Sequence, residues 1–132
     1  MAHHGPSLPP VILLVLPDHW PRSLLRAELI ERGYDAVGAP DLRTAFRFPS
    51  LGEPRGPVRL VILDEAALDG DAHRVLDLVL SEHGRPPVLL LARPLREPPV
   101  GPWARVVRRP FALGDLVAIV EEMVPLPPRP PY

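Results

Sequence analysis

The chain has 132 residues and a formal net charge of −1, and 46% of its residues are hydrophobic. This length suits one domain with one core, and the near-neutral charge gives no global electrostatic basis for binding nucleic acid. Cysteine is absent, which excludes disulfides and thiol chemistry, and all 15 basic residues are arginines. No apolar run is long enough to span a membrane and no signal peptide is visible, so we expect a cytoplasmic protein.

Five apolar runs have the length of strands and are nearly continuous rather than alternating. This pattern is typical of parallel strands that are buried on both faces. The runs cover residues 11–16, 35–39, 58–63, 87–92 and 104–107. Both ends of the chain are rich in proline, so we expect extended tails at 1–10 and 125–132 around one domain at 11–124.

Helical patterns lie between several of these runs. They cover residues 21–32, about 41–48, 71–83 and 113–124. Residues 93–102 contain four prolines and a glycine, so the connection between the last two strands cannot hold an ordinary helix. Right-handed crossovers then predict an α/β, flavodoxin-like three-layer fold. Its five-stranded parallel sheet would have the order 2-1-3-4-5, with the fourth helix reduced or absent.

Two of the predicted strands end in charged residues. The run VRLVILD ends at Asp64, and the run ARVVRRPF passes through Arg109 and Pro110. Ligands of open α/β sheets bind at the carboxyl ends of the strands, so these residues mark a candidate site.

Over residues 10–124 the chain resembles a bacterial response-regulator receiver domain. The resemblance rests on LDE at 63–65, LDG at 68–70, PVLLLA at 87–92 and RRPF at 108–111. It implies that Asp64 is the candidate phosphoacceptor. The neighbours that it implies in the same site are Asp18, Glu65, Ala92, Arg109 and Pro110.

Much of what supports phosphorylation in that family is missing. Leu16 and Pro17 fall where the family has two acids that hold Mg²⁺, and only Asp18 remains, one position later. Ala92 replaces the family's hydroxyl residue and Arg109 its lysine, which differs from arginine in shape and direction. Asp18 and Asp64 alone supply too few oxygen ligands for Mg²⁺, so we expect no metal and no cofactor.

We therefore expect a pseudo-receiver, a degenerate receiver-like module of two-component signal transduction that acts by protein binding and is not an enzyme. Two alternatives stay open. In the first, Asp64 is phosphorylated with Mg²⁺ near Asp18 and Glu65, and Arg109 supplies the cation. In the second, the fold serves an unrelated binding role. Asp64 could also simply cap the loop after its strand, and Asp18 the first helix.

A local excess of positive charge lies between residues 93 and 109, where five arginines face only Glu97. Such a patch fits an acidic partner. We expect a protein partner of unknown identity, or a second copy in a homodimer, and neither nucleic acid nor membrane. Ile119 lies off the predicted inward stripe of the last helix. The candidate interface residues are Trp103, Arg105, Arg108 and Ile119. The five histidines lack metal-ligand spacing, and we expect them to be solvated.

Overall fold

The computed structural model describes residues 8–48 and 54–128. Five parallel strands form one sheet in the order β2-β1-β3-β4-β5. The strands are β1 (Val11–Val15), β2 (Asp35–Ala39), β3 (Val58–Asp64), β4 (Val88–Ala92) and β5 (Trp103–Arg108). The predicted strand order and the parallel pairing are confirmed.

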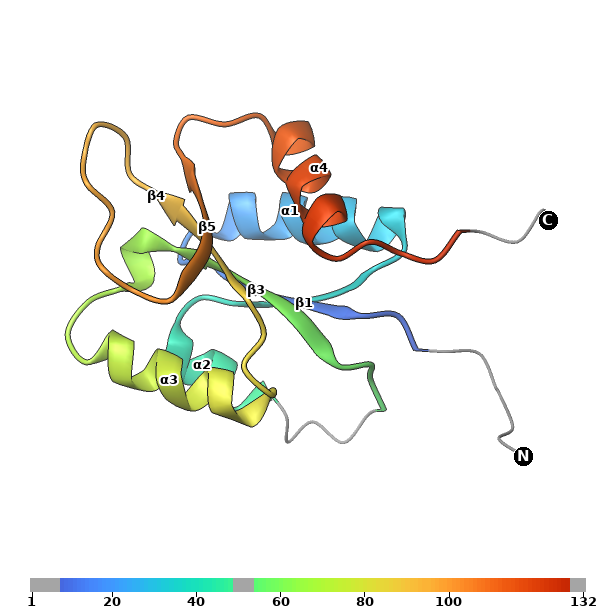
Figure 1. Cartoon of the computed structure of the whole chain (residues 1–132), viewed down its shortest axis with the longest axis horizontal. Coiled ribbons are helices and arrows are strands. Elements are labelled where there is room, and N and C mark those ends of the chain that lie inside the picture. Colours follow the sequence, from blue (N-terminus) through green and yellow to red (C-terminus); the bar gives the residue numbers. More distant parts are fainter. Residues whose placement is uncertain (1–7, 49–53, 129–132) are drawn as a thin grey trace.

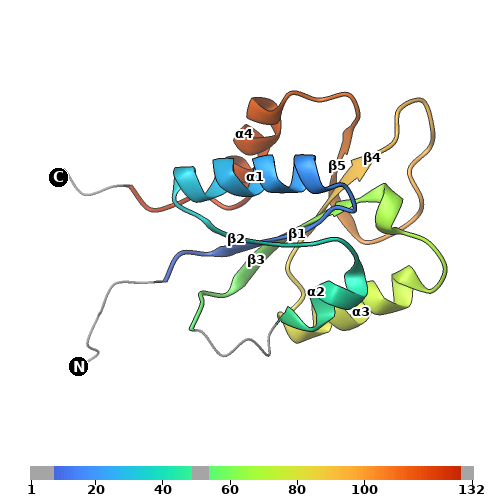
Figure 2. The same cartoon turned by 180° about the vertical axis from the view of Figure 1, so that it is seen from behind.

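Helices cover both faces of the sheet. They are α1 (His19–Arg32), α2 (Leu42–Phe46), α3 (Ala72–Glu82) and α4 (Leu113–Met123). Helices α1 and α4 lie on one face and α2 and α3 on the other, as Figures 1 and 2 show from opposite sides. This is the predicted three-layer arrangement. None of the described helices is long and apolar enough to cross a membrane.

The connection from β4 to β5 is irregular along its whole length. Residues 93–102 form no helix, and Figure 1 shows them as an open loop at the end of the sheet. The cause is local, because proline lacks the N–H that a helix interior requires and its ring clashes with the preceding turn. The predicted loss of the fourth helix is therefore confirmed.

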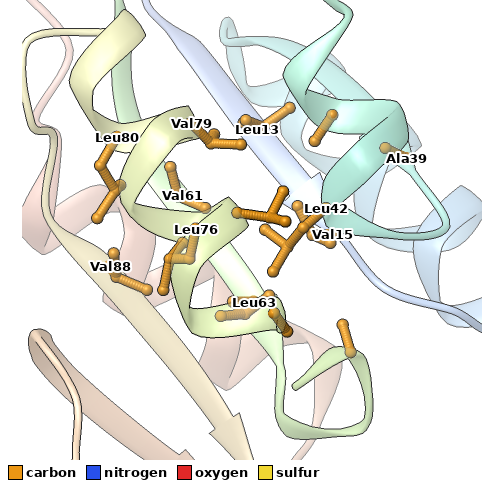
Figure 3. Close-up of a cluster of buried hydrophobic side chains, with 14 of the residues drawn as sticks. Leu13, Val15, Ala39, Leu42, Val61, Leu63, Leu76, Val79, Leu80 and Val88 are labelled. Carbon is orange, nitrogen blue, oxygen red and sulfur yellow. The ribbon is translucent and has the colours of Figure 1, made fainter. Parts of the chain in front are cut away.

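The sheet divides the hydrophobic core into two clusters. Leu13, Val61 and Leu90 belong to the cluster beneath α2 and α3, part of which Figure 3 shows. Their neighbours along the same strands, such as Leu14 and Ile62, belong to the cluster beneath α1 and α4. Successive side chains of a strand point to opposite faces, so strands covered on both sides must be apolar throughout. Strands β1 and β4 are accordingly buried at every residue.

Strand β5 is the exception. Its run at 104–107 was grouped with the apolar runs of the inner strands, but Ala104, Arg105 and Val106 are exposed. Expecting this run to be buried on both faces was wrong, because β5 lies at the edge of the sheet and pairs only with β4. The helix that would cover its second face is missing.

The final helix packs more extensively than its sequence pattern indicates. Ile119 is partly buried and packs against the cluster beneath α1 and α4, together with Leu116, Val117 and Val120. The prediction that Ile119 lies off the inward stripe is therefore wrong. The Tyr34 hydroxyl donates a 2.6 Å hydrogen bond to the carbonyl of Val124, which ties down the end of this helix.

The C-terminal tail begins later than predicted. Leu126 still packs against the cluster beneath α1 and α4. Residues 127–128 are exposed and irregular. The remainder of both predicted tails, at 1–7 and 129–132, lies outside the described residues.

His83 should make stability depend on pH. It is partly buried at the end of α3, 6.0 Å from the Phe48 ring, so the expectation that it is solvated was wrong. Burial lowers the pKa of His83 below the ordinary 6.5, while the charge of Glu82 acts in the opposite direction. The unfolded chain then binds a proton that the folded chain resists, so the free energy of unfolding should fall as pH drops below about 6.5.

Urea denaturation between about pH 7.5 and pH 5 measures this dependence. His83→Gln cannot be protonated, and it should give a flatter profile than the unmodified chain. Identical profiles for the two proteins would contradict the assignment to His83.

Candidate functional site

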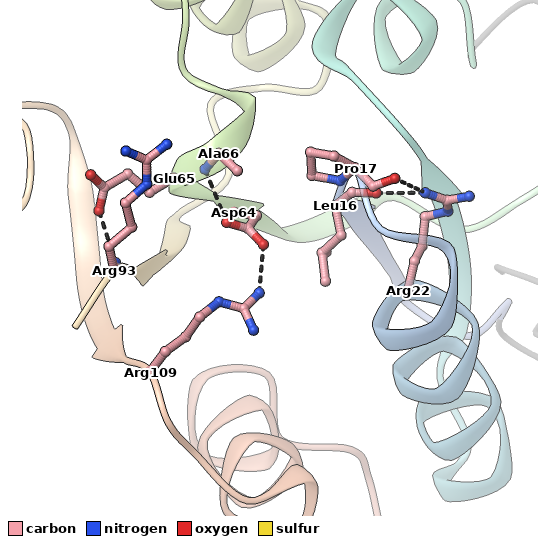
Figure 4. A network of polar contacts seen from close by, with 8 residues as sticks. All are labelled: Leu16, Pro17, Arg22, Asp64, Glu65, Ala66, Arg93 and Arg109. Atoms are coloured by element: carbon pink, nitrogen blue, oxygen red, sulfur yellow. Dashed lines mark hydrogen bonds and ion pairs between the residues drawn. The ribbon is translucent and has the colours of Figure 1, made fainter.

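Asp64 ends β3 at the carboxyl edge of the sheet, where it pairs in register with Leu91 of β4. Only 5% of the residue is exposed. Its Oδ1 accepts a 3.0 Å hydrogen bond from the backbone N–H of Ala66, and its Oδ2 lies 2.5 Å from Nη2 of Arg109 (Figure 4). The carboxylate therefore caps the turn at Glu65–Ala67 and also forms an ion pair.

Arg109 comes from the end of the edge strand and reaches back across the sheet. Its backbone N–H donates to the carbonyl of Ala92 at 2.9 Å, which fixes the point from which the side chain extends. The guanidinium lies 5.3 Å from the centre of the Phe111 ring. The peptide bond to Pro110 is cis. Arg109 thus places a permanent positive charge on Asp64, and its side chain is one-third exposed.

The loop after β1 offers backbone oxygens instead of carboxylates. Nη1 of Arg22, in the first turn of α1, donates to the carbonyls of Leu16 at 2.6 Å and Pro17 at 3.2 Å (Figure 4). Asp18 occupies the N-cap position of α1, as predicted, but its side chain makes no capping hydrogen bond and is exposed. An arginine therefore holds the loop in which the receiver family has its acids.

Glu65 is buried and does not face the Asp64 carboxylate as a metal ligand would. Its Oε1 accepts a 2.9 Å hydrogen bond from the backbone N–H of Arg93, just beyond the buried Ala92. Figure 4 shows this bond to the left of the Asp64 carboxylate, separate from the Asp64–Arg109 pair. Glu65 thus anchors the start of the 93–102 loop. No sequence pattern links these two residues, and sequence analysis missed the contact.

These residues do not fit a magnesium ion. Across the described ranges, no three His, Cys, Asp or Glu side chains are grouped so that they could hold a metal. Mg²⁺ needs octahedral oxygen coordination, and proteins usually bind it through one or two free carboxylates together with water and substrate phosphate. Here the Glu65 carboxylate is bonded to the N–H of Arg93, the Asp18 side chain is exposed, and a guanidinium already lies on one oxygen of Asp64.

An apolar cavity of about 340 Å³ lies beside the ion pair, between α1 and the start of α4. Leu16, Leu91 and Arg109 contribute to its wall. Trp20 and Leu24 lie at its mouth and are 72% and 54% exposed. Sequence analysis missed this cavity, although two large apolar residues four positions apart on one helix were a usable signal.

The candidate interface residues do not form one surface. Trp103 is partly buried against the cluster beneath α2 and α3, and its Nε1 donates to the carbonyl of Pro99 at 2.6 Å. Ile119 packs beneath α4 on the opposite side of the sheet. Arg105 and Arg108 are exposed on β5. Of the four candidates, these two arginines are the ones exposed at the surface, where Arg105 pairs with Glu122 and Arg108 donates to the carbonyl of Arg96.

No family model and no curated protein matches the chain. Solved structures do match it. A response regulator from Thermotoga maritima is 17% identical over 89% of this chain and 98% of its own, with a TM-score of 0.66. The receiver domain of NtrX from Brucella abortus is 25% identical over 86% and 97%, with a TM-score of 0.66. The signal receiver domain of an HD domain-containing protein from Pseudomonas fluorescens Pf-5 is 20% identical over 88% and 94%, with a TM-score of 0.67. The fold of this chain is thus the fold of response-regulator receiver domains.

Proposed function

We propose that this chain is a receiver-like module of bacterial two-component signalling that acts by binding another protein in the cytoplasm and transfers no phosphoryl group. The observation that supports this proposal is the state of Asp64, the residue at the family's phosphoacceptor position. Its two oxygens accept hydrogen bonds from Arg109 and Ala66. Among the described residues it belongs to no group of three or more His, Cys, Asp or Glu side chains that could hold a metal ion.

Phosphoryl transfer to a carboxylate brings negatively charged oxygens against another negative charge, and a metal ion normally offsets that repulsion. Arg109 supplies a positive charge, but its guanidinium lies on the nucleophile itself, at 2.5 Å from Oδ2. An attacking oxygen would first have to lose this partner. Ala92 also lacks the hydroxyl that would contact the phosphoryl group in the resembling family.

Without phosphorylation, the domain would act only through the surfaces by which it binds other proteins. The family's switch couples the hydroxyl residue to the fourth helix, and this chain has alanine in the first place and the 93–102 loop in the second. The module is therefore expected to hold one conformation and to bind its partner constitutively, with neither metal nor cofactor.

Incubation with Mg²⁺ and acetyl phosphate should leave the intact mass of the protein unchanged. Mass spectrometry before and after incubation measures this, with Asp64→Asn as the control for site. A receiver domain with a complete acidic site, treated in parallel, shows that the phosphodonor is active. A gain of one phosphoryl group that Asp64→Asn abolishes would overturn the proposal and support an atypical phosphoacceptor.

A further inference from the structure

The outer edge of β5 has an unused row of backbone hydrogen-bonding groups. The N–H of Arg109 donates to the carbonyl of Ala92 in β4, at 2.9 Å. Backbone groups of successive residues in a strand point to opposite edges, so those of Val106 and Arg108 point away from β4. No described strand pairs with β5 on that side. An exposed strand edge of this kind is a template for a further strand.

Apolar side chains of β5 and of the loop that leads into it are also exposed. The 93–102 loop leaves Leu95 99% exposed and Val100 95% exposed. Val106, in the middle of β5, is 37% exposed. An added strand would therefore find both backbone partners and an apolar surface, which is how extended peptides bind a sheet edge.

Positive charges flank both faces of the edge. Arg105 is in register with Leu89, of the cluster beneath α1 and α4, and pairs with Glu122 at 3.1 Å. Arg108 is in register with Ala92, of the opposite cluster, and donates to the carbonyl of Arg96. Because side chains of an added strand alternate between the faces, acidic residues at alternate positions would meet one arginine, and those at the intervening positions the other.

The surrounding charge also favours an acidic partner. Arg93, Arg96, Arg105 and Arg108 lie at this end of the sheet against Glu97 and Glu122, in a chain whose net charge is −1. The Arg105–Glu122 pair is about half exposed on each side, so it is weak and can exchange for a partner's carboxylate. A second copy fits poorly, because pairing two β5 edges would place the arginines of one copy beside those of the other.

We infer that the β5 edge of this chain binds an acidic, extended segment of a partner protein as a sixth strand of the sheet. The inference deepens the proposed function, on which it rests, by naming the surface and the chemistry of the partner. The backbone of β5 supplies affinity, and Arg105 and Arg108 supply selectivity for acidic side chains on both faces.

A synthetic peptide with the repeat Glu-Glu-Val-Val is the probe, because it places Glu on both faces of an added strand. The same peptide with Gln in place of every Glu is its neutral match. Trp103 begins β5 and reports binding by fluorescence in a Trp20→Phe background. We expect the Glu peptide to bind at least tenfold more tightly than the Gln peptide at about 50 mM salt, and the difference to shrink at about 500 mM. Equal binding of both peptides, or of neither, would overturn the inference.

Val106→Pro separates strand addition from simple charge attraction. It removes an N–H that points outward, and proline is tolerated on an edge strand in that position. Binding of the Glu peptide should weaken at least tenfold, while Val106→Thr, which keeps the N–H, should bind as the unmodified chain does. Arg105→Glu with Arg108→Glu should remove the preference for the Glu peptide.

Hydrogen exchange on the unmodified chain gives a second test that needs no variant. Adding the Glu peptide should slow exchange of the Val106 and Arg108 amides, which face outward, much more than exchange of the Val107 amide. Unchanged exchange at these amides, or unchanged peptide binding by folded Val106→Pro, would show attachment by charge alone. A dimer of the free chain that Val106→Pro abolishes would make a second copy the occupant instead.

The experiments give different results if the inference about the β5 edge is wrong and if the proposed function is wrong. If neither peptide binds and Asp64 stays unlabelled, the β5 inference is wrong, and phosphorylation-independent action stands. If Asp64 is labelled and the Glu peptide still adds to β5, the docking surface stands and the absence of phosphotransfer is wrong.

Discussion

Replacing Arg109 by methionine should lower the free energy of unfolding by about 1–3 kcal/mol, because it leaves the Asp64 carboxylate with a single backbone donor in a nearly closed site. The Asp64 side chain is only 7% exposed, so water replaces the lost guanidinium incompletely, whereas the methionine stem keeps much of the packing of Arg109. Urea denaturation of the two proteins at neutral pH measures the difference.

Asp64→Asn should lower the free energy of unfolding by less than Arg109→Met does. The Arg109 side chain is 33% exposed, so its guanidinium can turn to water when the carboxylate is gone. In the double variant the uncharged amide no longer needs a cation, and much of the stability should return. The double-mutant cycle should therefore show a coupling energy of about 0.5–3 kcal/mol, the usual range for residues in direct contact.

A matched pair elsewhere in the chain isolates the effect of burial. Arg43 and Asp71 also approach to 2.5 Å, but their side chains are 67% and 59% exposed. Arg43→Met should cost no more than about 1 kcal/mol, as exposed ion pairs do. Equal losses from Arg43→Met and Arg109→Met would show that burial of Asp64 does not strengthen its pairing, and would remove a main argument that this carboxylate is held rather than reactive.

The architecture could be predicted from the sequence because the strong signals were local. Val11–Val15 and Val88–Ala92 are apolar at every position, and only a strand between two layers of helices needs that. The loss of a helix at 93–102 followed from proline chemistry. The helix expected at about 41–48 is only Leu42–Phe46, with Asp41 capping it through a 2.7 Å bond from the N–H of Thr44.

What could not be predicted depended on position in the assembled sheet. Strand β5 has the length of an inner strand and apolar residues at most positions, but it also carries Arg105 and Arg108. The strand order shows that it lies at an edge of the sheet. Ile119 was misplaced for a similar reason, since its contacts come from the position of α4 over the sheet and not from the spacing of its apolar residues.

The candidate site likewise has one part that the sequence could predict and another that it could not. The carboxyl ends of parallel strands meet at one edge, so Asp64 and Arg109 could be assigned to one site from sequence. The direct contact between Arg109 and the Asp64 carboxylate could not be predicted from sequence, because the two residues are 45 positions apart and the contact depends on side-chain geometry. Arg22 on the Leu16 and Pro17 carbonyls is a further contact without a sequence signature.

Leu90→Ala should be the most damaging of these substitutions, lowering the free energy of unfolding by about 2–5 kcal/mol. Leu90 is 0% exposed and lies in β4 in register with Leu63 and Val106. The lost side chain leaves a cavity between the sheet and α3 that the backbone of β4 cannot move to close, because β4 is paired with β3 on one side and with β5 on the other. The free energy of unfolding of such domains is about 5–15 kcal/mol in total, so this one substitution should remove a large fraction of it.

Leu95→Ala is the control, since it removes the same atoms from a side chain that is 99% exposed in the 93–102 loop. It should change the free energy of unfolding by no more than about 0.5 kcal/mol, and urea denaturation of both variants measures the contrast. A substantial loss in Leu95→Ala would mean that the loop is packed against the sheet in solution. The apolar surface assigned to the β5 edge would then be covered, because Leu95 is one of the exposed side chains that an added strand is expected to meet.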